Sequence, residues 1–224
     1  WITYQAKTLK CNTSYYWKVK IDTNKGATNW SAPAFWTTGL FNEADWQGQW
    51  IGLDRTAPGD SETRWSRLAA RYLRKEFAVK KSVKRATVHI AGMGLYELFI
   101  NGQRIGNQVL APAPTDYRKT ILYNTYDVTS LLQTENAIGV TLGNGRFYTM
   151  RQNYKPYKIP TFGYPKLRLN LIVEYADGSK ETIATNTSWK LTTEGPIRSN
   201  NEYDGEEYDA RKELGAWTQT GYDD

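Results

Sequence analysis

The stretch Tyr96-Glu-Leu-Phe-Ile-Asn-Gly-Gln-Arg-Ile105 decides the fold class, because an Asn-Gly pair separates two runs that contain apolar residues. Asn101 and Gly102 are residue types that readily adopt the left-handed backbone of a two-residue hairpin turn. Asn-Gly flanked by apolar alternation is the strongest short-range signal for a β-hairpin. We therefore predict two antiparallel strands that are joined at Asn101-Gly102.

Short strands separated by turns extend outward from this hairpin over most of the chain. Asp177-Gly-Ser179 predicts a second hairpin turn, and Val128–Leu132 is the only helical candidate, one turn long. Many short strands with frequent turns and almost no helix predict an all-β fold, an antiparallel β-sandwich or jelly roll. The main strands are expected at residues 69–77, 83–91, 137–142, 167–175 and 181–185.

The first forty residues have a pattern of their own. From Tyr15 to Ile21 the residues alternate with period two, a turn follows around Lys25-Gly26, and Phe35-Trp-Thr-Thr-Gly39 ends the unit. This order resembles the last strands of a fibronectin type III domain, which needs about 100 residues. We predict that residues 1–40 are the C-terminal part of such a sandwich and that residues 41–224 are a separate β-sandwich domain. The chain begins and ends within a pattern, which indicates a piece of a longer protein.

The composition of the chain, and the presence of only one Cys and one His, argue against several classes of function. Lys and Arg exceed Asp and Glu by 29 to 23, but the excess is dispersed along the chain, whereas nucleic-acid binders concentrate it on one face. No apolar run approaches the roughly 20 residues of a membrane span. Cys11 and His89 are each the only residue of their type, so the chain has no internal disulfide, no Cys-His metal cluster and no support for a Ser-His-Asp triad. We expect His89 to be buried in a strand.

Two polar stretches, Leu110–Lys119 and Asn201–Arg211, predict loops rather than strands because they are rich in Pro, Gly and charge. Binding residues often lie on such loops over a rigid scaffold. Carboxylates accept hydrogen bonds from sugar hydroxyls, Arg and Asn donate them, and Tyr offers a ring face. We expect these loops and Gly143–Arg146 to converge at one end of the sandwich. The predicted carbohydrate-binding residues are Asp116, Tyr117, Asn144, Arg146, Asn201, Tyr203 and Glu206.

Several motifs occur in the order typical of one family. They are Trp46-Gln-Gly-Gln-Trp-Ile51, Leu73-Arg-Lys-Glu-Phe77, Gly92-Met-Gly-Leu-Tyr-Glu-Leu98, Asn101-Gly-Gln-Arg-Ile-Gly106, Leu110-Ala-Pro-Ala-Pro-Thr-Asp-Tyr117, Tyr123–Thr129, Leu142-Gly-Asn-Gly-Arg-Phe-Tyr148 and Tyr203–Arg211. With these motifs, residues 41–224 resemble the N-terminal β-sandwich module of bacterial α-L-rhamnosidases of glycoside hydrolase family 78. The fibronectin-like fragment before them resembles the usual neighbour of that module.

The resemblance implies an enzyme that releases terminal L-rhamnose from plant glycosides or polysaccharides with inversion. Its two carboxylates would lie in a downstream (α/α)6 barrel, so none of the carboxylates here is assigned to catalysis, and we expect the fragment alone to be inactive. The implied partners are L-rhamnose or a rhamnosylated glycan and that catalytic domain, in a bacterial protein of the periplasm or cell exterior. Some related modules bind rhamnose with calcium, which prefers oxygen ligands and suggests Asp116, Asn144 and Asp204.

Other interpretations stay open. The polar loops are also compatible with packing against the catalytic domain, with Asp209 and Arg211 pairing only with each other and Glu206 satisfying a buried arginine. Many relatives carry Trp where this chain has Ala113-Pro114 and Phe147, so polar contacts are expected to outweigh ring stacking. The rival class is a non-catalytic scaffold or adhesion protein built of β-sandwich modules.

Overall fold

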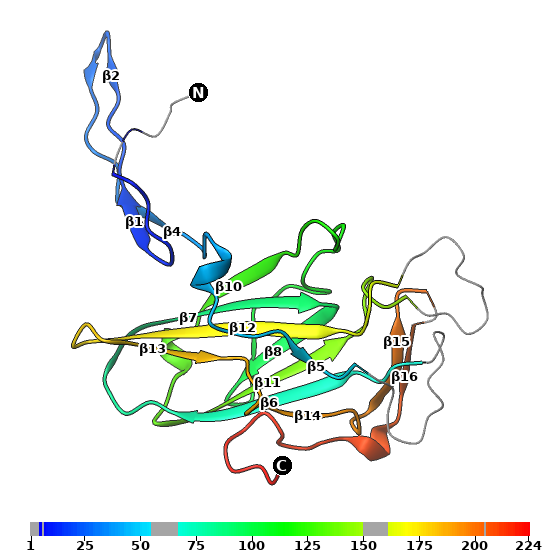
Figure 1. Ribbon diagram of the computed structural model, residues 1–224. Helices are drawn as coiled ribbons and strands as arrows, with labels where there is room; N and C mark the ends of the chain where they lie inside the picture. Colours follow the sequence, from blue (N-terminus) through cyan, green and yellow to red (C-terminus); the bar gives the residue numbers. More distant parts are fainter. Residues whose placement is uncertain (1–4, 6, 55–66, 150–160, 204) are drawn as a thin grey trace. The chain divides into compact units, whose positions relative to one another are not determined.

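The computed structural model describes residues 5, 7–54, 67–149, 161–203 and 205–224, and Figure 1 shows its strands in chain order. The chain divides into two compact units, Trp1–Trp46 and Gln47–Asp224. The paired strands of the described residues are antiparallel, and the helical segments there are the short 3-10 turns η1 (Glu43–Asp45), η2 (Thr129–Leu131) and η3 (Ala210–Lys212). The prediction of an all-β fold is confirmed, and the single helical candidate is a 3-10 turn. None of these turns has the length and apolar character of a membrane span.

The first unit has little interior. Strand β1 (Ser14–Trp17) pairs with β4 (Ala34–Thr37), and β2 (Asp22–Thr23) pairs with β3 (Gly26–Ala27). Tyr15 stacks on Trp36 with ring centroids 5.1 Å apart, but Tyr16 and Phe35 are 74% and 68% exposed. The two buried hydrophobic clusters of the described residues both lie in the second unit. The apolar alternation that was expected to reach Ile21 therefore supports a strand only as far as Trp17.

The second unit is a sandwich of two antiparallel five-stranded sheets. In the first sheet the order is β10-β7-β12-β13, and β5 also pairs with β12; in the second it is β14-β6-β11-β8-β9. The strands of the first sheet are β5 (Ile51–Gly52), β7 (Val83–Met93), β10 (Tyr123–Asp127), β12 (Lys166–Tyr175) and β13 (Lys180–Ala184). The strands of the second are β6 (Arg71–Ala78), β8 (Leu95–Ile100), β9 (Gln103–Ile105), β11 (Glu135–Gly143) and β14 (Lys190–Thr192).

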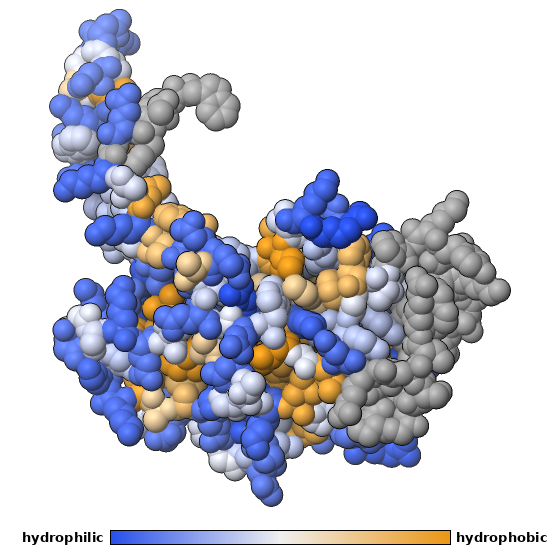
Figure 2. Space-filling model, viewed as in Figure 1, coloured by the Kyte–Doolittle hydropathy of each residue, from blue (hydrophilic) through white to orange (hydrophobic). Residues whose placement is uncertain are grey.

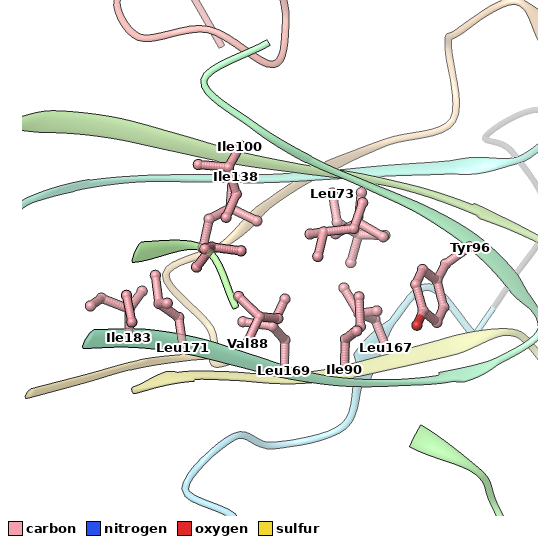
Figure 3. Close-up of a cluster of buried hydrophobic side chains, with 14 of the residues drawn as sticks. Leu73, Val88, Ile90, Tyr96, Ile100, Ile138, Leu167, Leu169, Leu171 and Ile183 are labelled. Atoms are coloured by element: carbon pink, nitrogen blue, oxygen red, sulfur yellow. The ribbon is translucent and has the colours of Figure 1, made fainter. Parts of the chain in front are cut away.

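The core lies between these two sheets, as the side chains in Figure 3 show. Alternation along β12 sets one face, because Leu167, Leu169 and Leu171 are fully buried while Arg168 between them is half-buried. Leu73 and Ile138 cover them from the second sheet. Each such side chain stabilises the fold by about 1.5–3 kcal/mol relative to an exposed position.

The Asn-Gly hairpin is present where the sequence predicts it. Asn101 and Gly102 have φ of 51° and 81°, and Ile100 pairs with Gln103 across the turn. The Asn101 amide also donates to Leu131 O at 3.0 Å and to Asn136 Oδ1 at 2.9 Å, and its Oδ1 accepts from Ala137 N at 2.9 Å. The turn is therefore bonded to the start of β11 as well as to its own strands.

One expectation is wrong. The stretch Asn201–Arg211 was expected to contain no regular strand, but β15 (Ile197–Asn201) and β16 (Gly205–Tyr208) form an antiparallel hairpin. The residues of β16 are exposed. A strand without a buried face has no apolar alternation, so its sequence is indistinguishable from that of a polar loop.

Candidate functional site

Three connections meet through side chains at one place. Arg146, in the β11–β12 connection, donates hydrogen bonds to the Glu202 carboxylate and to the Tyr203 hydroxyl in the β15–β16 turn. Tyr117, in the β9–β10 connection, lies edge-on to Phe147 with ring centroids 5.2 Å apart. We call Tyr117, Arg146, Phe147, Phe162, Glu202 and Tyr203 the three-loop cluster. The expected convergence of three connections is therefore present.

Asparagine side chains hold two of the connections together. The Asn144 backbone N–H donates to Asn200 Oδ1 at 2.6 Å, and Asn144 Nδ2 donates to Asn200 O at 2.7 Å and to Leu68 O at 3.1 Å. Neighbouring glycines permit this approach, because a Cβ on Gly143 would lie 2.8 Å from Asn200 Oδ1. These contacts place Arg146 next to the β15–β16 turn.

Aromatic rings close the other side of the cluster. Tyr117 also lies edge-on to Phe162 at 5.3 Å, and Phe147 stacks on Phe162 at 6.0 Å. The Phe162 backbone N–H donates to Phe147 O at 2.9 Å, which holds the two ends of the β11–β12 connection side by side. Edge-on and offset contacts at such distances are favourable. The rings form a rigid apolar wall beside the Arg146–Glu202 pair.

Charge and burial differ across the cluster. The Arg146 and Glu202 side chains are 39% and 36% exposed, and the hydrogen bond to Glu202 raises the pKa of the Arg146 guanidinium. The Tyr117 hydroxyl is buried and has no hydrogen-bond partner among the described residues. Burial raises the pKa of Tyr117, the Glu202 charge adds to this, and Arg146 opposes it. The cluster therefore offers an ion pair that solvent reaches and a neutral phenol without a hydrogen bond to the described part of the chain.

The β9–β10 connection has an unusual backbone and an apolar surface. Leu110 has φ of 57°, a left-handed conformation that costs a non-glycine residue about 1–3 kcal/mol. Val109 and Leu110 are 80% and 71% exposed, although both are apolar. Tyr96 N donates to Ala111 O at 2.7 Å, so the strained residue precedes a point of attachment to β8. Strain and exposed apolar side chains together make this connection a candidate for contact with a partner.

Comparison with known proteins identifies the family. Residues 81–224 match the model of the alpha-L-rhamnosidase N-terminal domain, and this match covers more than half of the chain. The chain belongs to the alpha-L-rhamnosidase N-terminal domain family. Residues 1–42 match the model of the Rha78A-like N-terminal immunoglobulin domain.

Relatives of this rhamnosidase N-terminal domain are longer proteins. An alpha-L-rhamnosidase of Formosa agariphila is 39% identical over 243 aligned positions, which cover 100% of this chain and 25% of the relative. The structure of the alpha-L-rhamnosidase from Dictyoglumus thermophilum is 41% identical with a TM-score of 0.85, and the match covers 99% of this chain and 25% of that one. The alpha-L-rhamnosidase from Aspergillus terreus is 35% identical with a TM-score of 0.84, over 97% and 25% of the two chains. The chain thus spans about a quarter of the length of these relatives.

Of the predicted sugar-binding residues, the structure joins Tyr117, Arg146 and Tyr203 in the three-loop cluster of this N-terminal domain. Asn201 ends β15, and its Oδ1 accepts from Tyr203 N at 2.9 Å, so it shapes the turn. Glu206 lies exposed on β16 and forms no ion pair with another described residue, so the buried arginines of the described part are not its partners. Asp209 does pair with Arg211, at 2.8 Å.

Asp116 and Asn144 are placed differently from Arg146. The Asp116 carboxylate is exposed and accepts from Arg118 Nε at 3.0 Å, a hydrogen bond that lowers its pKa. Asn144 is 2% exposed and uses its amide N–H groups to hold the backbone. Within the described residues, no hydrogen bond joins Asp116 to Asn144. A direct contact between sugar and the Asn144 side chain would require movement of β15 or of the loop.

The described residues fit a calcium site only in part. They contain no group of three or more His, Cys, Asp or Glu side chains that is arranged for a metal ion. Asn144 Oδ1 is buried and without a hydrogen-bond partner, and it is an oxygen of the type that calcium prefers. Asp116 already pairs with Arg118, and the third predicted ligand, Asp204, lies outside the described residues. Calcium therefore stays a prediction.

Sequence reasoning missed Glu202, Phe147 and Phe162 as members of the cluster. Glu202 lies between two residues that were predicted, and its proximity to Arg146 follows from the contacts that join Asn144 to Asn200, which is 56 positions away in the sequence. Phe162 is near Tyr117 because the β11–β12 connection folds back on itself. A local clue existed for Glu202 alone, because an acidic side chain in the same stretch is the natural partner of a loop arginine.

Proposed function

We propose that this chain is the non-catalytic, sugar-recognising part of an α-L-rhamnosidase that hydrolyses terminal L-rhamnose from plant glycosides or polysaccharides. Its two catalytic carboxylates would lie in a downstream (α/α)6 barrel, which belongs to the rest of the protein. Family membership and the quarter-length match to named alpha-L-rhamnosidases support this division of labour. They also disfavour a scaffold or adhesion protein. The observation that carries the sugar-binding part is the three-loop cluster, where Arg146 connects Glu202 and Tyr203.

The cluster has the groups that a 6-deoxy sugar requires. Arg146 has planar N–H donors, the Glu202 carboxylate accepts, and the Tyr203 hydroxyl does both. The wall formed by Phe147 and Phe162 is suited to the methyl group of L-rhamnose. Because the Arg146–Glu202 pair is preformed, little side-chain entropy is lost on binding.

Calorimetric titration with L-rhamnose tests this proposal. Arg146→Gln should weaken binding about 10- to 100-fold, the loss expected for hydrogen bonds to a charged group worth about 1.5–3 kcal/mol. Arg104→Gln is the matched control, because Arg104 pairs with Glu97 at 3.1 Å and is 38% exposed, close to the 39% of Arg146. Absence of binding by the unmodified chain, or equal loss in both variants, would contradict a sugar site at the cluster.

The calcium site and the cellular location of the protein are separate parts of the proposal. We propose that a calcium ion is held through Asp116, Asn144 and Asp204, supported by Asn144 Oδ1, which has no hydrogen-bond partner among the described residues. A chelator should then abolish rhamnose binding, and Asp116→Ala should do the same. Rhamnose binding that persists in the presence of chelator would contradict the proposed calcium site.

We further propose that the protein is exported to the periplasm or the cell exterior, because polysaccharides do not enter cells freely. Cell fractionation tests this location.

A second role is packing against the catalytic part of the same protein. It is favoured by Val109, Leu110 and Leu122, which are 80%, 71% and 42% exposed and belong to one connection. In the full-length protein, Val109→Ser with Leu122→Ser should lower the melting temperature, while the same changes in this chain alone should not. Equal effects in both proteins would contradict packing.

We also propose that residues 1–40 are the C-terminal part of a fibronectin type III-like sandwich that begins before this chain. A structure of the longer protein would test this.

A further inference from the structure

A cavity that is separate from the three-loop cluster lies at one edge of the sandwich. It has a volume of about 570 Å³ and is lined by residues of β5 and β12 from one sheet and of β6 and β14 from the other, together with the segment 186–189. This volume lies within the range of about 300–1,000 Å³ that is usual for small-molecule sites. We call this cavity the edge pocket. It shares no lining residue with the three-loop cluster.

The edge pocket combines apolar and polar walls. Leu73 and Trp189 are buried, and Leu191 and Trp50 are half-buried, so these lining side chains form an apolar base. The Trp50 ring has the guanidinium of Arg168 6.0 Å from its centroid. In Figure 2, orange apolar atoms lie beside blue polar ones in the part of the view where Figure 1 places β5 and β14.

The rim has hydrogen-bonding groups that the fold leaves unused. Among the described residues, no group donates to or accepts from the side chains of Gln49 and Thr187. Asn186 Oδ1 accepts from Ser188 N at 2.9 Å and from Ser188 Oγ at 2.6 Å, whereas its Nδ2 has no partner among the described residues. Two amides and a hydroxyl are thus available to a ligand at one cavity.

The lysine side chains of the rim each lie near a carboxylate. Lys166 Nζ lies 2.8 Å from Asp54 Oδ2, and Lys190 Nζ lies 3.7 Å from Asp224 Oδ1. Because each lysine already has a carboxylate nearby, the pocket does not present a strong unpaired charge. This favours a neutral or weakly charged ligand with many hydroxyl groups over a phosphate or a nucleic acid.

We propose that the edge pocket binds one pyranose ring of the glycan as a second, non-catalytic sugar site. A pyranose has an apolar C–H face, which suits the base with Trp50, and equatorial hydroxyls, which suit the amide and hydroxyl groups of the rim. The choice of a sugar as ligand rests on the proposed function, whereas the position of the binding site rests only on the residues that line the edge pocket.

Fluorine NMR of the chain labelled with 5-fluorotryptophan tests the proposal. The probes are the neutral sugars methyl α-L-rhamnopyranoside and methyl β-D-galactopyranoside, and the Trp50 signal is assigned with Trp50→Phe. We expect the Trp50 signal to move and to saturate with at least one of these sugars. The three-loop cluster contains no tryptophan, so binding there would leave this signal in place.

Two variants locate the effect. Gln49→Leu with Thr187→Val should raise the concentration for half-maximal shift about tenfold or more, because two hydrogen bonds to the sugar are removed. Both side chains are exposed, and Asn186 is left unchanged because it stabilises its own turn. Arg146→Gln should leave the Trp50 titration unaltered, even where it abolishes binding at the three-loop cluster. A Trp50 signal that neither sugar moves, or one that moves equally in the double variant, would overturn the edge-pocket proposal alone.

Discussion

Asn101 combines a left-handed backbone with three side-chain hydrogen bonds, so both the residue type and the turn position contribute to stability. Asn101→Ala should lower the free energy of unfolding by about 2–4 kcal/mol, because alanine is strained at this φ and buried groups near Asn136 lose their partner. Asn101→Gly should cost less, because glycine accepts the φ and only the hydrogen bonds are lost. Urea unfolding measures both.

Asn107 is the matched control for this prediction. It is exposed and forms no hydrogen bond with another described residue, so Asn107→Ala should change stability by less than about 0.5 kcal/mol. If alanine and glycine at Asn101 had the same effect, backbone strain would have no part in the stability of the turn.

His89 is fully buried on β7, as the alternating sequence around it predicts, and its Nδ1 lies 2.9 Å from Thr125 Oγ1. Burial, with a smaller effect of Arg85, lowers its pKa to about 4. Because this value is below the roughly 6.5 of the unfolded chain, the unfolded state takes up the proton first as the pH falls. Stability should therefore fall by about 2 kcal/mol between pH 7 and pH 5.

The pH effect can be assigned because the sequence contains a single histidine. Urea unfolding at pH 7 and pH 5 should show the difference in the unmodified chain and much less of it in His89→Gln. A histidine variant that kept the full pH dependence would show that carboxylates, rather than His89, are responsible.

The segment after η3 is attached to β6 mainly through one side chain. Arg74 is 5% exposed and donates to Trp217 O at 2.7 Å, Gln219 O at 2.6 Å and Asp224 Oδ2 at 2.6 Å. Arg74→Met should release this segment, because the methionine keeps the apolar stem but none of the donors. Hydrogen exchange of the Gly221 amide, which donates to Glu76 Oε1 at 2.8 Å, should become at least about tenfold faster, equivalent to about 1.4 kcal/mol.

Lys190→Met is the control for the Arg74 change, because Lys190 also approaches Asp224 but is 63% exposed. Exposed pairs of this kind contribute about 0–1 kcal/mol, so exchange at Gly221 should stay nearly the same. Exchange in the centre of β11 should not change in either variant. Slow exchange at Gly221 in Arg74→Met would show that packing of Trp217 holds the segment by itself.

At the level of strands, the sequence patterns predicted the structure correctly where a strand has one buried face or where a turn requires a particular residue. The hairpin at Asn101-Gly102 follows from turn chemistry, and β12 follows from its alternation of buried leucines. The hairpin of β15 and β16 was missed because neither the half-buried residues of β15 nor the exposed residues of β16 have an apolar period. Periodicity reports burial, so it detects only those strands that contribute to a core.

For the whole molecule, the distribution of buried residues predicts which part folds independently. Both buried hydrophobic clusters lie within Gln47–Asp224. A fragment of residues 47–224 should unfold cooperatively with a melting temperature within about 2–4 °C of the full chain, the change that 1 kcal/mol causes at this size. Near-ultraviolet circular dichroism during heating measures this.

A shorter fragment, residues 81–224, is the control. It corresponds to the family match but lacks β6, an interior strand of the second sheet that carries the buried Leu73. It should not unfold cooperatively. A folded 81–224 fragment would show that β6 is dispensable for the sandwich.

The three-loop cluster shows what sequence reasoning can and cannot predict about a site. Tyr117, Arg146 and Tyr203 were identified because polar and aromatic residues on loops are candidates for binding. Their actual neighbours depend on contacts between residues that are far apart in sequence, as in the contact of Arg146 with Glu202. The same holds for Asn144, whose side chain is used to join backbone segments.

The strand order has a consequence for behaviour at high concentration. The four longest strands, β6, β7, β11 and β12, all have neighbours on both sides, while the second sheet ends in the three-residue strands β14 and β9. These short edges carry Lys190 and Arg104. Long apolar strands with a free edge are templates for intermolecular β-pairing, whereas short charged edges discourage it. Among the described strands, this order favours a domain that stays monodisperse at high protein concentration.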